Sequence, residues 1–197
     1  MTTERPAASD RSTATEPATP PAGPAVGLGL GPMLKVDGTW YIGDHESRAC
    51  LAVLPEGFEH RVAGRDPFLV PWHRLMSLEL GVTSSRFLSS PVGGLVAGRH
   101  EPAIGTHGSC LRAMVRHPYD LWSPRFVHHR WWYPAPEVTL LHQLLGAIVD
   151  LGRVHRLGDD AWLTATVELL ATDRFLRRWR TSKAVADGVR DIVVREA

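Results

Sequence analysis

The residue pattern changes at Pro134, and this change constrains the fold more than any other feature of the chain. Before Pro134 the chain has short runs interrupted by Gly, Pro and charged residues, as in strands joined by turns. After it, residues 137–151 place apolar side chains on a wide face of one helix, and Gly152 follows. This order predicts an α+β fold in which one helix closes a small antiparallel β-barrel or sandwich.

Seven runs before Pro134 have the length and composition of strands. These runs are residues 39–43, 49–54, 57–62, 68–72, 74–82, 110–116 and 125–130. In the run 74–82, apolar residues from Met76 to Val82 occupy every second position, which predicts one face turned toward the core. In the run 110–116, Leu111, Ala113 and Val115 alternate in the same way with Arg112, Met114 and Arg116.

Composition divides the chain into three parts. Residues 1–32 are rich in Pro, Ala, Thr and Gly and lack aromatic residues, so we predict a disordered leader that acts as a tether. Residues 33–155 form the predicted β domain with its closing helix. Residues 156–197 form a predicted helical appendage, in which Asp159 or Asp160 caps one helix and Ser182 caps another.

The formal net charge is +1, from 22 basic and 21 acidic residues. No global field therefore attracts nucleic acid or an anionic membrane. The longest helical stretch without Asp, Glu, Lys or Arg, residues 138–149, is shorter than the ~20 residues that span a bilayer. Because no signal peptide is visible and both cysteines are expected to stay free thiols, we predict a cytoplasmic protein without a transmembrane segment.

Residues 34–151 resemble bacterial members of the pleckstrin-homology-like (PH-like) superfold. The resemblance lies in the order of the strand-like runs, above all residues 49–62 and 68–82, and in the helix that follows them. Residues 137–151 lack the tryptophan that the family usually carries there, and the first loop, residues 44–48, is acidic where inositol-phosphate binders carry Lys or Arg. The resemblance implies a binding or scaffolding module that does not take phosphoinositide headgroups.

The most unusual local composition is the run of histidines, arginine and aromatic residues just before Pro134. Such residues either hold a partner in an exposed groove or fill space where the sheet meets the helix, and both interpretations remain open here. On the first interpretation, the residues that bind a protein or peptide partner are His128, His129, Arg130, Trp131, Trp132 and Tyr133.

A second candidate surface is basic and lies within residues 174–180. An arginine-rich stretch with aromatic residues is able to contact an anionic membrane or nucleic acid, although an ordinary solvated helix face has the same composition. The arginines of this patch are Arg174, Arg177, Arg178 and Arg180.

Signatures of catalysis are weak. The loop before residue 111 has metal-capable side chains that could act with His128 or His129 in an enzyme, but their spacing matches no metal-binding signature. These side chains are His100, Glu101, His107 and Cys110. Ser109 has no base or acid partner that the sequence identifies. We therefore assign no catalytic residue, metal or cofactor.

Taken together, these patterns favour a non-enzymatic binding or scaffolding module that recognises a protein or peptide. One alternative is a metal-dependent enzyme that uses residues 100–110. The other is a regulator that contacts an anionic membrane or nucleic acid through residues 174–180. Phosphoinositides and nucleic acid are not expected as partners.

Overall fold

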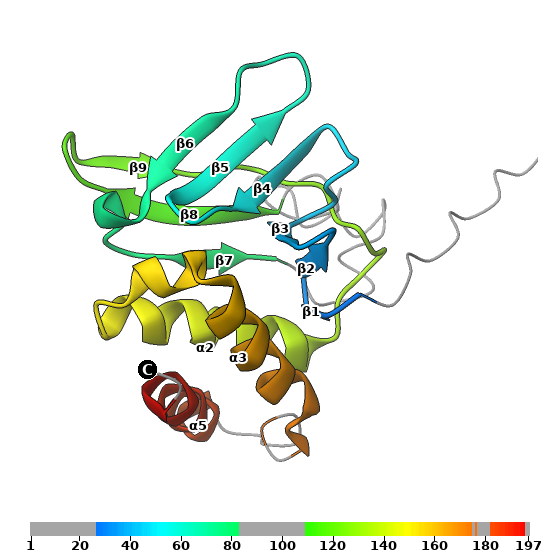
Figure 1. Cartoon of the computed structure of the whole chain (residues 1–197), viewed down its shortest axis with the longest axis vertical. Coiled ribbons are helices and arrows are strands. Elements are labelled where there is room, and N and C mark those ends of the chain that lie inside the picture. Colours follow the sequence, from blue (N-terminus) through cyan, green and yellow to red (C-terminus); the bar gives the residue numbers. More distant parts are fainter. Residues whose placement is uncertain (1–26, 83–108, 175, 177–181, 196–197) are drawn as a thin grey trace, which may run out of the picture.

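The computed structural model describes residues 27–82, 109–174, 176 and 182–195, and it confirms the α+β class (Figure 1). Six antiparallel strands form one sheet in chain order: β1 (Gly29–Leu30), β2 (Met33–Val36), β3 (Thr39–Ile42), β4 (Ala49–Val53), β5 (Gly57–Val62) and β6 (Phe68–Pro71). A three-stranded sheet contains β7 (Glu79–Gly81), β8 (Cys110–Val115) and β9 (Asp120–Trp122). The α-helices are α2 (Ala135–Asp150), α3 (Asp160–Thr172) and α5 (Ser182–Arg195), with 3-10 turns η1 (Trp72–Arg74) and η2 (Val154–Gly158).

Local sequence determines the tight turns of the larger sheet. Asp37 and Gly38 have positive φ angles of 48° and 79°, the backbone that an Asp-Gly pair favours in a two-residue hairpin turn. This turn joins β2 to β3. Between β4 and β5, Leu54 and Gly57 exchange both backbone hydrogen bonds, at 2.9 and 3.3 Å. These turns set the strand register and thereby decide which side chains face the core.

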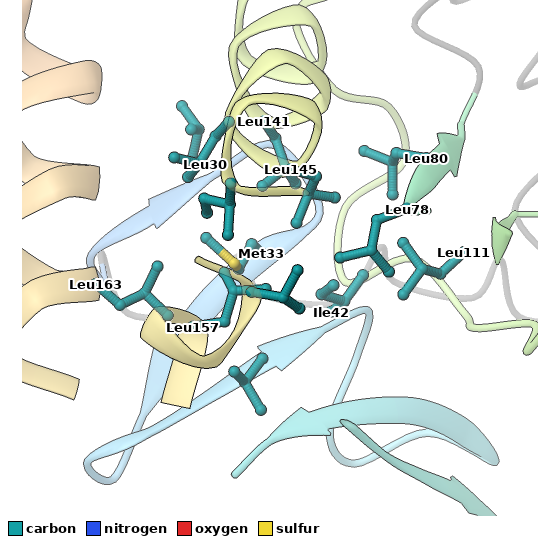
Figure 2. Close-up of a cluster of buried hydrophobic side chains, with 14 of the residues drawn as sticks. Leu30, Met33, Ile42, Leu78, Leu80, Leu111, Leu141, Leu145, Leu157 and Leu163 are labelled. Atoms are coloured by element: carbon teal, nitrogen blue, oxygen red, sulfur yellow. The ribbon is translucent and has the colours of Figure 1, made fainter. Parts of the chain in front are cut away.

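The core lies between the two sheets and α2. One cross-strand row of the larger sheet consists of Trp40, Val53, Phe58 and Val70, all of them buried. Figure 2 shows Leu141 and Leu145 of α2 in one cluster with side chains from both sheets, such as Met33 and Leu111. Because each fully buried side chain of this kind contributes about 1.5–3 kcal/mol, this cluster is the main source of stability.

An extended segment after β9 connects the two sheets. Its amides donate to carbonyls on both sides, Phe126 to Ser109 (3.0 Å) and Val127 to Ala49 (2.9 Å). The predicted strand at residues 125–130 is therefore wrong: only an isolated bridge forms there, at Arg125, because the backbone groups are shared between two neighbours. Closure of both sheets into one barrel stays a prediction.

The run 74–82 also differs from the single strand that its alternation predicts. Leu75 pairs with Val115, and Glu79 pairs with Arg112. Between these two pairs the run 74–82 has three residues, whereas β8 has two. Such a bulge reverses the face on which the following side chains lie. Met76 was expected to face the core but is 46% exposed, whereas Leu78 is buried as expected.

The three helices lie together on the side of the molecule away from β5 and β6 (Figure 1). α2 agrees with the predicted helix 137–151 to within two residues at either end. The α3 cap is also as predicted, because Asp159 Oδ1 accepts a hydrogen bond from Trp162 N (3.1 Å). α5 packs mainly on α2. Buried side chains of all three helices belong to the same hydrophobic cluster as those of the sheets.

The described part of the chain begins at residue 27 and so includes the end of the predicted leader. Leu30 of β1 is buried and packs in the cluster with α2 (Figure 2). The preceding residues, 1–26, lie outside the described residues. Among the helices that the structure describes, none has the length and apolar character needed to cross a membrane.

Candidate functional site

The structure divides the predicted partner-binding segment between surface and interior. His128 and Tyr133 are buried, His129 and Trp132 are half-buried, and Arg130 and Trp131 are exposed. Arg130 Nη1 lies 3.7 Å from Glu137 Oε2 at the start of α2. A partner that approached this segment would therefore meet mainly Arg130 and Trp131, rather than six side chains along one groove.

Trp131→Ala is expected to change the free energy of unfolding by less than about 0.5 kcal/mol, because the side chain is 60% exposed. Trp40→Ala should cost about 3–5 kcal/mol, because Trp40 is 2% exposed and lies in the central core row. Urea denaturation followed by circular dichroism measures both. A loss of similar size for the two variants would mean that the Trp131 ring belongs to the core.

Ser109 has a partner that the sequence did not identify. Its Oγ and the Nε2 of His128 form a short hydrogen bond, and the His128 ring lies 4.8 Å from the Tyr133 ring. Ser109 and His128 are both buried, and Ser109 is fully so. The bond joins the residue directly before β8 to the segment before α2.

Tyr133 fixes the second histidine of this cluster. The hydroxyl accepts a hydrogen bond from the His129 backbone N–H. It also lies 3.2 Å from His129 Nδ1, to which its O–H can donate a hydrogen bond. Burial first, and then the nearby charges of Arg130 and His128, lower the pKa of His129 to about 4. Burial also raises the pKa of Tyr133. Both side chains are therefore neutral at neutral pH.

The other predicted sites are only partly within the described residues. Cys110 is a buried free thiol, while His100, Glu101 and His107 lie outside the described residues. Within the described ranges no group of three or more His, Cys, Asp or Glu side chains is placed to hold a metal ion. Of the basic patch, Arg174 is exposed, and Arg177, Arg178 and Arg180 lie outside the described residues.

An exposed apolar row crosses the three-stranded sheet on the face turned away from the core. Met76 N donates to Met114 O (2.8 Å), and Met114 is the register partner of Leu121. These side chains are 46, 39 and 60% exposed. Arginines border the row on the same face. We call this surface the outer face and define it as Arg74, Met76, Arg112, Met114, Arg116 and Leu121.

Backbone carbonyls hold two arginines of the outer face. Arg74 Nε donates to Arg116 O (3.0 Å), and Arg116 Nε donates to His73 O (2.8 Å). Within the described part of the chain, no carboxylate forms an ion pair with Arg74, Arg112 or Arg116. Glu79 is the register partner of Arg112, so the positive charge is least balanced at Arg74 and Arg116.

The edge strand β9 is blocked against pairing with a further strand. In β8, the Met114 N–H donates to the Ser77 side chain and the Met114 C=O accepts from Met76 N, so both groups point away from β9. Because backbone groups alternate in direction along a strand, the residues on either side of Met114 point theirs toward β9. In β9 the Leu121 N–H consequently points away from β8, and Asp120 Oδ1 accepts it at 2.8 Å. A carboxylate at the edge that occupies the outward donor prevents a new ladder from forming there.

The edge strand β6 is blocked by proline. Trp72 N donates to Glu56 O (3.1 Å), so the even-numbered residues of this region direct their backbone groups toward β5 and the odd-numbered ones direct them outward. Pro67 and Pro71 occupy two outward positions and have no N–H. Within residues 67–71, Leu69 alone keeps an outward amide.

Sequence reasoning found only part of the outer face. The alternation of Arg112, Met114 and Arg116 was visible as the polar side of a strand. Two facts were not visible: the bulge that turns Met76 outward, and the short strand β9 that carries Leu121. Both depend on pairing between segments that are distant in the sequence.

Comparison of the chain with protein-family models, curated proteins and solved structures finds no match. The PH-like resemblance therefore stays a prediction.

Proposed function

We propose that this chain is a non-enzymatic module that recognises a protein or peptide through its outer face. The observation that carries the proposal is the exposed row of Met76, Met114 and Leu121. Methionine side chains are flexible and polarisable and adapt to a partner's surface. Arginine and tyrosine are enriched at protein interfaces, and Tyr119, 70% exposed, lies in the turn between β8 and β9.

The arrangement of polar groups favours binding over catalysis. In the described part of the chain, the side chains closest to a catalytic arrangement, Ser109 and His128, are buried and bonded to each other. The outer face presents apolar and cationic groups without a nucleophile beside a base. The PH-like resemblance, with the barrel closure and the scaffolding role that it implies, is part of the same proposal.

The test is a crosslink followed by an affinity measurement. A photoreactive amino acid at Leu121 in the source cells identifies the protein that contacts the outer face, and the same label at the exposed Leu169 of α3 serves as the positional control. The purified partner should then bind the double variant Met76→Ser, Leu121→Ser at least about tenfold more weakly than the wild type. The matched helix variant Leu169→Ser, Val194→Ser should bind as the wild type does.

Two results would contradict the proposal. One is a partner that crosslinks equally from both positions. The other is an affinity that the outer-face substitutions leave unchanged while circular dichroism shows both variants folded.

A further inference from the structure

We infer that the partner segment is an acidic amphipathic peptide that lies across the outer face. It places apolar side chains on Met76, Met114 and Leu121 and carboxylates against the arginines that border them. This inference rests on the proposed function and adds the chemistry of the partner.

The strand pleat sets the spacing of the charges. Arg112 and Met114 occupy alternate positions of β8 and so share one face about 7 Å apart, and Arg116 continues this alternation directly after the last residue of β8. Arg74 lies beside Arg116, because Arg116 N donates to Arg74 O (2.9 Å). The apolar row therefore has cationic groups on both sides, and a segment with apolar residues in its centre and acidic residues at its flanks matches this order.

The two least balanced arginines are pre-organised for carboxylates. Their Nε atoms are held by backbone carbonyls, which orients each guanidinium plane and leaves its terminal nitrogens as donors. Guanidinium nitrogens bind carboxylates in a planar, often bidentate geometry. Since no carboxylate of the described part forms an ion pair with Arg74 or Arg116, an acidic partner displaces no ion pair between described residues there.

The sheet edge determines how the segment docks. Asp120 already accepts the outward Leu121 N–H, so the segment does not extend the sheet as a further strand. Asp120 and Glu79 also place negative charge at the margins of the face, which keeps an acidic segment centred between them.

A peptide fits this face better than an anionic membrane does. Met76 and Met114 are less than half exposed and lie between arginines, so Leu121 is the one residue of the apolar row that is more than half exposed. Insertion into a membrane requires apolar side chains that reach beyond the charged groups around them.

A selection from short random peptides displayed on phage tests this inference on the full chain. Peptides are selected on the wild type and on Arg74→Glu, Arg116→Glu, and the net charge and apolar content of the enriched pools are compared. The wild type should enrich acidic peptides with apolar residues, and the charge-reversed variant should enrich basic ones. Affinity of the acidic peptides should fall at least about tenfold on charge reversal and should weaken as salt rises toward 0.15 M, roughly physiological strength.

Controls separate charge from folding. Arg48→Glu, Arg65→Glu changes the net charge equally at exposed positions in two loops of the larger sheet and should enrich the same acidic pool as the wild type. Arg74→Gln, Arg116→Gln removes both charges but keeps a donor for the backbone carbonyls, so it should lose acidic peptides while its thermal melt stays near that of the wild type.

Each outcome decides a different point. Peptides that require Met76 and Leu121 but show no acidic bias overturn this inference and leave the proposed function standing. A pool that does not depend on the outer face counts against both. Binding to phosphatidylserine vesicles without any peptide enrichment overturns the inference in favour of a lipid surface.

Discussion

Gly57→Ala should lower the free energy of unfolding by about 3 kcal/mol. Gly57 begins β5 and faces β6 so closely that an added Cβ would lie 2.1 Å from the Val70 carbonyl oxygen and 2.8 Å from Pro71 Cα. All the atoms in the way belong to the backbone, so no side chain can rotate to make room. The neighbouring strand would have to move away from β5 and weaken the core row that contains Phe58 and Val70.

Gly146→Ala is the matched control for this substitution. Gly146 lies inside α2, and apart from the backbone of its own helix turn no atom lies within 4 Å of the added Cβ. Alanine in a helix interior is more stable than glycine by about 0.5–1 kcal/mol. Urea denaturation should therefore show the two substitutions moving stability in opposite directions. Equal stability of Gly57→Ala and the wild type would mean that β5 and β6 do not approach each other so closely.

Stability is also expected to fall by up to about 3 kcal/mol between pH 6.5 and pH 4 because of His129. The pKa of His129 is about 4 in the folded protein against an ordinary value of 6.5. Between these values the unfolded chain binds the proton and the folded chain does not, so protonation favours unfolding. The contribution is fully present above pH 6.5 and is lost as the pH falls toward 4.

His129→Gln isolates this effect. The glutamine oxygen can still accept a hydrogen bond from the Tyr133 hydroxyl, but the glutamine side chain of this variant does not titrate. Its stability should therefore decline less steeply with acid than that of the wild type, when both are measured by urea denaturation at a series of pH values. A residual slope is expected, because burial also lowers the pKa of His60. Parallel curves for the two proteins would show that His129 does not carry a depressed pKa.

Local patterns predicted much of this fold, and pairing between distant segments explains the rest. The helix before Gly152 was predictable, because the helical spacing of its apolar residues and the glycine that ends it are both local features of the sequence. The cap of α3 by Asp159 was predictable for the same reason. β9 was not, since three residues after a tight turn have no distinguishing period.

The candidate site follows the same division. The alternation along β8 predicted its polar side, but Met76 belongs to the outer face only because of the bulge opposite β8. The bond between Ser109 and His128 joins residues that no local pattern relates. Exposure of Trp131 and burial of Tyr133 were also beyond sequence reasoning, because either ring could have filled the junction.

The blocked edges have a consequence for crowded solutions. A second molecule that meets β6 finds prolines at Pro67 and Pro71, and one that meets β9 finds the Asp120 carboxylate in place of a donor. Neither of these two edge strands offers the run of free backbone N–H groups on which cross-β fibrils form. The chain can therefore display an apolar, cationic patch to its surroundings without β6 or β9 pairing with another copy.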